Sequence, residues 1–262
     1  MKQTNKTEVK PFRAYARELV LALRSVAFIA SLVIFVCSVV LVCWPFIYVS
    51  RRVAFFVFSS TTRVSLWLMR LILRIKVRFE NLDILHSTKA AYPCFLLAPK
   101  HQSEIETLIF SIFFDSFRIV YKQGINELPI ISSYMKRMNF IAIDREAGRA
   151  ALQTLLDEGL KSIGTGSPIL IFPEGTRTAF GERGNYHAGV ALMYEKMNVP
   201  ILPVVHNSGQ FFKPHAFIKD PGEIVFRFLP PIYPGLSARE ALKELEAKLE
   251  EDKSVHNIGL SA

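Results

Sequence analysis

The 262-residue sequence predicts an α/β fold, in which a mixed, largely parallel sheet flanked by helices follows an N-terminal two-helix membrane segment. Three observations predict this. A long uncharged apolar run lies near the N-terminus, a more basic apolar run follows it, and from residue 75 short apolar runs alternate with helical patterns. Strands separated by helices are typical of an α/β sheet. We therefore divide the chain into a membrane-associated helix pair with a basic N-terminus, residues 1–74, and an α/β domain, residues 75–262.

The first apolar run, Val26–Val49, holds 24 residues without a charge, more than the ~20 that cross a bilayer core. Trp44 and Tyr48 lie near its end, where interfacial aromatic residues occur. A cleavable signal peptide is the alternative, but the run is too long and lacks a small-residue cleavage site. Basic residues flank both ends of the run, so the distribution of charge does not indicate which end lies on the cytoplasmic side. We favour a hairpin that enters one leaflet over a full span.

The second run, residues 52–74, carries four arginines that would lie within about 40° of one another on a helix. The remaining surface is apolar, so the pattern predicts a helix at the membrane surface with its arginines among the headgroups. A second spanning helix is the alternative, and Arg63 in the middle of the run weighs against it. The predicted membrane-binding residues are Arg52, Arg63, Trp67, Arg70 and Arg74.

The net charge of +9 is concentrated around these two runs. Residues 1–24 carry +4 and residues 51–79 carry +7, whereas residues 80–262 carry −2. A nucleic-acid-binding protein would carry its basic patch on the folded domain. Basic residues that flank apolar helices indicate anionic lipid headgroups instead, so membrane lipids are expected partners and nucleic acid is not.

Seven apolar runs of the domain predict strands, at Ile75–Phe79, Cys94–Ala98, Arg118–Tyr121, Phe140–Ile143, Ile169–Phe172, Ile201–Val205 and Ile224–Phe228. Helical patterns between them cover Leu108–Phe114, Ile130–Met138, Arg149–Ser162 and Gly189–Met197. Ser237 and Glu240 form a capping box that opens a last helix, ending at about Glu251, whose charges place it on the surface. The three cysteines are odd in number and form no C-x-x-C pair, which argues against a disulfide scaffold and a zinc site.

A first site motif follows the second domain strand, where His101 precedes two acids, Glu104 and Glu106. A neutral imidazole can take a proton from a hydroxyl when a partner fixes its tautomer and stabilises the cation. A histidine near two acids also occurs as an ordinary surface cluster, so the motif alone leaves both interpretations open.

A second motif, Phe172-Pro-Glu-Gly-Thr-Arg177, directly follows a buried strand. A glycine there lets backbone amides approach a ligand. The planar guanidinium of an arginine can donate two parallel hydrogen bonds to a phosphate. Glu174 could orient Arg177 or pair with Lys122. A turn held by a salt bridge is the alternative.

Other charged residues also lie where strands end and ligands bind in open sheets. Lys122 ends one predicted strand, and Asp144 with Arg145 follows another, although these two could equally form a structural ion pair. The strand Pro200–Val205, which has a proline at each end of its first half, indicates only a place in the core. His206 after it is expected to be a structural histidine rather than a second site histidine.

Taken in order, these stretches resemble the 1-acylglycerol-3-phosphate acyltransferase family, the lysophosphatidic acid acyltransferases among the glycerolipid acyltransferases. That family is marked by H-x-x-x-x-D, a K-x-E-L box ending in an I-D-R-like sequence, F-P-E-G-T-R, and an apolar box with proline. The corresponding segments here are His101–Glu106, Lys122–Arg145, Phe172–Arg177 and Ile201–Val205, within about residues 93–215. The F-P-E-G-T-R box is complete.

The sequence departs from the family pattern at four positions. Glu106 stands where the family usually has Asp, and it keeps the charge on a longer arm. Gly124 and Ile125 replace the common Glu-Leu, and Ser132 stands where glycine is common. The last three changes fall in the box linked to lysophospholipid binding, so they bear on the acceptor more than on the chemistry.

The resemblance implies acyl transfer from acyl-CoA or acyl carrier protein to the 2-hydroxyl of lysophosphatidic acid, without a cofactor or a metal. His101 would act as general base, and Glu106 would orient its ring and stabilise the cation. The residues implied in binding the acceptor phosphate are Lys122, Glu174, Gly175, Thr176 and Arg177. We expect a bacterial inner membrane, with the catalytic domain on the cytoplasmic side.

Three other functions stay open at this point. One is the same reaction on another lysolipid acceptor, such as a lyso-amino-acid lipid. Another is a membrane lipid hydrolase, although the sequence has no G-x-S-x-G nucleophile motif. A lipid-binding protein without catalysis would be expected to lose His101, which is present.

Overall fold

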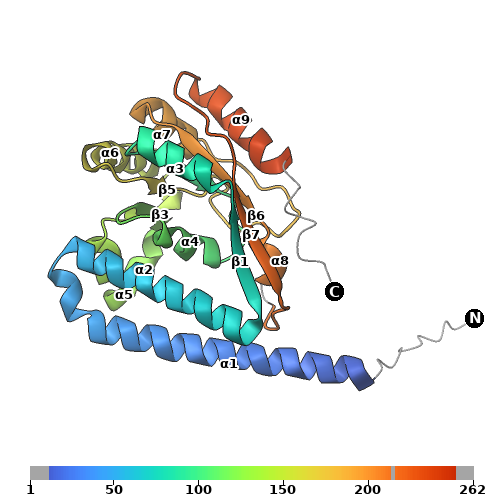
Figure 1. The fold of residues 1–262 in the computed structure, drawn as a ribbon. Coiled ribbons are helices and arrows are strands. Elements are labelled where there is room, and N and C mark those ends of the chain that lie inside the picture. The colour runs from blue at the N-terminus through green and yellow to red at the C-terminus, as the bar shows by residue number, and fades with distance from the viewer. Residues whose placement is uncertain (1–11, 214–215, 252–262) are drawn as a thin grey trace, which may run out of the picture.

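A computed structural model describes residues 12–213 and 216–251 of the chain. Its first feature is a helical hairpin beneath the rest of the molecule, made of α1 (Phe12–Cys43) and α2 (Arg51–Leu68) (Figure 1). A 3₁₀ turn, η1 (Pro45–Tyr48), joins the two helices. Tyr15–Cys43 and Arg51–Leu73 are long and apolar enough to cross a membrane. Most of the apolar surface of α1 is exposed, with Ile34 at 68 %, which indicates contact with lipid.

The second helix of the hairpin packs on the domain. The hydroxyl of Ser50 caps it by accepting a hydrogen bond from Val53 N at 3.1 Å. Its buried face, which includes Phe55 and Thr62, lies against the domain. Because Phe55 belongs to the same core as the strands, the hairpin and the domain share one hydrophobic core across residue 74.

A wide turn ends the hairpin and alters the predicted arginine stripe. The π-helix η2 (Met69–Leu73) follows α2, and Arg74 then takes a left-handed conformation with φ 57°. The predicted stripe required a regular α-helix through residue 74. Because the helix widens at Met69 and ends before Arg74, Arg74 does not continue the line of arginines along the helix. Arg63 donates to Ser59 Oγ and to the carbonyl of Ile112, and thus turns toward the domain. Arg52, Arg70 and Arg74 are exposed, and their role at a membrane stays a prediction.

The sheet has seven strands in the order β1-β7-β6-β2-β5-β3-β4, and every neighbouring pair is parallel except β6 with β7. The strands are β1 (Ile75–Glu80), β2 (Leu96–Pro99), β3 (Arg118–Lys122), β4 (Ile141–Ile143), β5 (Ile169–Leu170), β6 (Ile201–His206) and β7 (Gly222–Phe228). The predicted mixed, largely parallel sheet flanked by helices is confirmed. All seven predicted strands are present, with ends that differ by one or two residues.

The helices of the domain agree less closely with the sequence pattern. They are α3 (Leu82–Ala91), α4 (Ile105–Ile109), α5 (Pro129–Arg137), α6 (Arg149–Thr165), α7 (Gly189–Met197), α8 (Ser208–Phe211) and α9 (Ala238–Glu251), with the 3₁₀ turns η3 (Phe110–Ile112), η4 (Gln123–Glu127) and η5 (Arg145–Ala147). The prediction of a helix at Leu108–Phe114 was wrong in its limits, because α4 begins at Ile105 and continues only as η3. The sequence pattern did not predict α3, because only two of its residues, Leu85 and Thr88, are buried.

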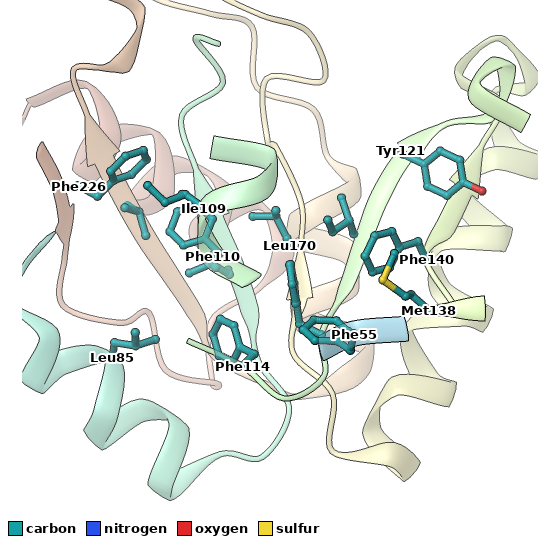
Figure 2. Packing of buried hydrophobic residues seen from close by; sticks show 14 of the residues in the cluster. Phe55, Leu85, Ile109, Phe110, Phe114, Tyr121, Met138, Phe140, Leu170 and Phe226 are labelled. Carbon is teal, nitrogen blue, oxygen red and sulfur yellow. The ribbon is translucent and has the colours of Figure 1, made fainter. Parts of the chain in front are cut away.

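Each face of the sheet has its own core. The face toward α2 and α4 is rich in phenylalanine, and Figure 2 shows Phe110 against Phe226 and Phe114 nearby. The face toward α6, α7 and α9 is aliphatic. The capping box at Ser237 is confirmed, since Ser237 and Glu240 bond each other's backbone. The helix α9 lies on the surface as predicted and buries one apolar stripe, which includes Leu245.

Candidate active site

The candidate residues gather at the carboxyl ends of the central strands. His101 follows β2, Glu174 follows β5, and Lys122 ends β3. Because β2, β5 and β3 are parallel neighbours, their carboxyl ends open onto the same edge of the sheet. The structure therefore brings together three residues that lie 21 to 73 positions apart in the chain.

His101 and Glu106 form a hydrogen-bonded pair. The His101 Nδ1 atom lies 3.1 Å from Glu106 Oε1. The helix α4 begins just before Glu106 and turns its carboxylate back toward the loop that carries His101. The imidazole stacks on Phe172, with ring centroids 3.9 Å apart, which fixes the ring plane. Within residues 12–213 and 216–251, Nε2 has no hydrogen-bond partner.

Glu106 is ionised and held from several sides. It is fully buried, and Oε1 also accepts hydrogen bonds from Gln102 N at 2.6 Å and Ser103 N at 2.5 Å. Oε2 accepts from the hydroxyls of Ser103 and Ser208. Burial alone would raise the pKa of Glu106, but the hydrogen bonds from His101 and Ser103 and the nearby His206 lower it to about 2. A carboxylate only accepts hydrogen bonds, so Nδ1 carries a proton, and in the neutral ring Nε2 then keeps its lone pair.

The F-P-E-G-T-R loop holds the backbone of His101 at both of its polar groups. Glu174 Oε2 accepts a hydrogen bond from His101 N at 2.6 Å, and the His101 carbonyl accepts one from Thr178 N at 2.7 Å. Gly175 takes φ 66°, and a Cβ there would lie 2.9 Å from the ring of His187. Only glycine fits this turn without displacing its neighbour.

The predicted partners of Glu174 were wrong. Its side chain is buried and points inward to Lys100, with Oε1 at 3.8 Å from Lys100 Nζ. Arg177 instead pairs with Glu104 at 2.6 Å, and both of these side chains are largely exposed. Lys122 is exposed at the end of β3, and its ammonium has no ion pair in the described part of the chain. Arg177 and Lys122 can therefore reach a solvent-borne phosphate, whereas Glu174 supports the His101 loop from within.

A buried lysine behind this loop was not found by sequence reasoning. Lys100 is only 5 % exposed, and its ammonium donates to Glu250 Oε1 at 2.7 Å. The same oxygen accepts from the Tyr186 hydroxyl at 2.7 Å. Burial raises the pKa of Glu174, which the adjacent Lys100 partly offsets. The only signal in the sequence was the position of Lys100 next to His101.

Replacing Lys100 with methionine is expected to destabilise the protein by about 3–5 kcal/mol, because the buried Glu174 and the partly buried Glu250 would lose their shared cation. Thermal unfolding of the purified full-length protein measures this loss. Lys161→Met is the matched control, since Lys161 makes an exposed ion pair with Glu158 that is worth about 1 kcal/mol or less. Equal losses in the two variants would show that Lys100 is not needed to balance Glu174 and Glu250.

The remaining candidates have structural partners. His206 is buried, its Nε2 lies 2.9 Å from the carbonyl of Lys100, and its Nδ1 accepts from Ser208 N, as expected of a structural histidine. Asp144 caps η5 by accepting from Glu146 N. No ion pair joins Asp144 to Arg145 among the residues that the structure covers, so that alternative is not supported.

Two cavities flank the His101 loop. One, of about 460 Å³, lies between α6, α7 and the F-P-E-G-T-R loop and is lined by Phe172, Gly175 and Arg145. The other, of about 480 Å³, is apolar and lies between the hairpin, α4 and α5; Phe28, Phe58 and Glu104 are among its lining residues. No group of three or more potential metal ligands occurs in the described ranges.

Comparison with known proteins shows which family the chain belongs to. A family model described as acyltransferase matches residues 76–207, half of the chain. A 1-acyl-sn-glycerol-3-phosphate acyltransferase of Pseudomonas aeruginosa is 31% identical over 195 residues, which cover 74% of each protein. One of Borreliella burgdorferi is 25% identical over 209 residues, 79% of this chain and 80% of that one. The crystal structure of the acyltransferase PlsC of Thermotoga maritima has a TM-score of 0.68 at 21% identity, covering 92% of this chain and 96% of that one, and thus shares the fold. The four motifs, the matched family model and the relatives agree, and the chain belongs to the acyltransferase family.

Proposed function

We propose that this acyltransferase moves a fatty-acyl group from acyl-CoA or acyl carrier protein to the 2-hydroxyl of lysophosphatidic acid, giving phosphatidic acid. The names of the relatives support this acceptor. The observation that carries the chemistry is the His101–Glu106 pair, in which a buried carboxylate holds Nδ1 and leaves Nε2 open. A lipid-binding protein without catalysis would have no need of this arrangement.

The pair supports a direct transfer. Nε2 of His101 takes the proton of the acceptor hydroxyl as its oxygen attacks the thioester carbonyl carbon. The carbon–sulfur bond then breaks, and the imidazolium returns the proton to the departing thiolate, so that a thiol is released. Glu106 stays ionised throughout and stabilises the imidazolium. Holding both substrates in register supplies up to about 7–11 kcal/mol of the barrier reduction.

The acceptor phosphate would lie near Lys122 and Arg177. Both side chains are exposed at the same sheet edge as His101. Arg177 is paired with Glu104, and a phosphate dianion would compete with that carboxylate for the guanidinium fork. Gly175 and Thr176 of the same loop line the cavity of about 460 Å³, so their backbone faces space that a ligand could enter.

The apolar cavity beside Glu104 supports delivery of a lipid substrate from the bilayer. Its walls come from the exposed hairpin and from α5, so an acyl chain could stay in apolar surroundings while its polar end reaches His101. We place the hairpin in one leaflet of a bacterial inner membrane, with the domain on the cytoplasmic side. The antiparallel hairpin, whose second helix is packed on the domain, supports one-sided insertion (Figure 1).

A different lysolipid acceptor is the second candidate. Ser132 is buried, and its hydroxyl and that of Tyr121 both bind the side chain of Asn126, at 3.2 and 2.8 Å. These bonds fix the segment after Lys122, in which the family's common glycine and Glu-Leu are replaced. A changed shape at this segment would alter the space for an acceptor headgroup.

Thiol release by purified full-length protein in detergent tests these proposals. We expect release from acyl-CoA, or from acyl carrier protein, that requires lysophosphatidic acid. The same assay with a panel of lysolipids of different headgroups identifies the acceptor. Release without any acceptor would contradict the proposal and indicate a hydrolase. Release with another lysolipid but not with lysophosphatidic acid would favour the second candidate.

A further inference from the structure

A third cavity, of about 500 Å³, lies far from His101 at the opposite ends of the strands. The start of α2, the turn between α5 and β4, and the second half of α6 enclose it. Its charged lining residues are Arg51, Arg118, Lys136, Glu158 and Lys161. Four cations and one acid give the lining a charge of +3, in a domain whose residues 80–262 carry −2 in total.

The single acid of this cavity is already engaged. Glu158 binds the guanidinium of Arg118 with one carboxylate oxygen and the ammonium of Lys161 with the other. Arg118 also donates to the carbonyl of Asn139 at 2.5 Å and to the hydroxyl of Ser162 at 2.8 Å. Arg118 therefore has its acceptors within the protein, and each oxygen of Glu158 is already paired with a cation.

Arg51 lacks an acceptor. Its Nε and Nη2 atoms are buried, and neither has a hydrogen-bond partner in the described part of the chain. Lys136 lines the same cavity, is exposed, and makes no ion pair with the residues that the structure describes. Buried N–H groups without an acceptor are unfavourable, because they have lost their hydrogen bonds to water and gained none in the protein. An anion in the cavity would supply the acceptor that Arg51 Nε and Nη2 lack.

The cavity lies beside the tip of the hairpin, where a lipid headgroup would be. Exposed Trp44, Phe46 and Tyr48 lie in the turn that leads into Arg51, and interfacial aromatic residues of this kind mark the headgroup level of a bilayer. Arg137 donates to the carbonyls of Ile47 and Tyr48, at 2.9 and 3.2 Å, and so fixes the tip against α5.

We propose that this cavity binds a phosphate group through Arg51 and Lys136, and that an anionic phospholipid headgroup supplies it. An arginine fork matches phosphate geometry, and Lys136 adds a second cation at the mouth. This lipid is not a substrate, because the cavity is at the end of the sheet away from His101. Its occupation would fix the hairpin tip on an anionic membrane, independently of which lysolipid accepts the acyl group.

Thermal unfolding of the full-length protein in neutral-detergent micelles tests the site. One series adds phosphatidylglycerol and a second adds inorganic phosphate. A ligand that binds the folded protein but not the unfolded chain raises the unfolding temperature, and the rise grows with the ratio of its concentration to its Kd. We expect phosphatidylglycerol to raise it for the wild type and for the exposed, distant control Arg239→Gln, but not for Arg51→Gln. Lys136→Gln, at an exposed position, should weaken apparent lipid affinity about fivefold, which is typical of one basic residue at a lipid headgroup.

The two series separate the sources of the phosphate. A rise with inorganic phosphate alone that Arg51→Gln abolishes would keep the phosphate site but assign it to a soluble ligand. Inorganic phosphate can also reach Lys122 and Arg177, so the diagnostic quantity is the difference between the wild type and Arg51→Gln. Without added phosphate or lipid, Arg51→Gln should be at least as stable as the wild type, because it removes a partly buried cation that has two buried, unpaired donors. An equal rise in wild type, Arg51→Gln and Lys136→Gln would overturn the proposal.

Discussion

Replacing His101 with alanine is expected to slow acyl transfer by about 10²–10⁴-fold, the usual contribution of a general base. The KM for the acceptor should change little, because the ring does not belong to the proposed phosphate site. The fold should persist, since the bonds from His101 N to Glu174 and from Thr178 N to the His101 carbonyl involve only the backbone of residue 101. Acceptor-dependent thiol release at saturating substrate measures the effect.

His86→Ala is the matched control for this loss. His86 lies exposed on α3, so its replacement should leave the rate unchanged. If His101→Ala kept the wild-type rate, the proton would have to leave by another group, and the proposed mechanism would be wrong. If both variants lost activity equally, the loss would report damage to the fold rather than to the base.

Glu106→Gln should lower the same rate by about 10²-fold or more with little loss of structure, because it removes the charge that stabilises the imidazolium. A glutamine carbonyl can stay at the Oε1 position and accept from His101, Gln102 and Ser103, as the carboxylate does. Its amide group would then donate to the hydroxyls of Ser103 and Ser208. The variant thus separates the charge of Glu106 from its geometry.

Combining the two substitutions tests whether the residues act as one unit. In a protein that already lacks His101, Glu106→Gln should cost little further activity, because there is no imidazolium left to stabilise. Losses that multiply in the double variant would mean that Glu106 acts on the reaction by a route other than His101. The measurement is the rate of thiol release by the wild type, the two single variants and the double variant, at the same substrate concentrations.

The single substitution Glu106→Gln should also change how the stability of the protein depends on pH. The pKa of Glu106 is lowered from 4.5 to about 2, so its carboxylate stabilises the fold above about pH 4.5 and loses that contribution as the pH falls toward 2. The contribution is on the order of 3 kcal/mol. The wild type should therefore lose stability more steeply than Glu106→Gln between about pH 5 and 2. Parallel unfolding curves over that range would contradict the lowered pKa.

The sequence predicted the features that depend on neighbours in the chain. The strands could be found because each is a short buried apolar run. The His101–Glu106 pair could be found because the five-residue spacing places both side chains at one loop and the first turn of the following helix. Local spacing, however, does not decide which charges meet across the fold. Glu174 had two plausible cations in the motifs, Arg177 and Lys122, yet it lies against Lys100.

Distant partners and irregular turns account for the other failures. Lys100 is balanced by Glu250, 150 residues away, and no pattern near either residue indicates the other. The π-helical turn before Arg74 contains no proline or glycine that would reveal it. Arg51 directly precedes the predicted stripe, but its unpaired donors become visible only when α5 and α6 enclose it.

The pairing of β1 with β7 has a consequence for synthesis of the chain. Ile75, at the end of the hairpin, pairs with Gly222, so the strand nearest the membrane finds its neighbour only when most of the protein has left the ribosome. The hairpin emerges long before that and can enter the bilayer first. The strands then assemble into the sheet beside the membrane while the rest of the chain is still being synthesised. Until β7 is made, β1 has no neighbouring strand to pair with. A product that stops short of β7 would thus be attached to the membrane and left with an open, aggregation-prone strand edge.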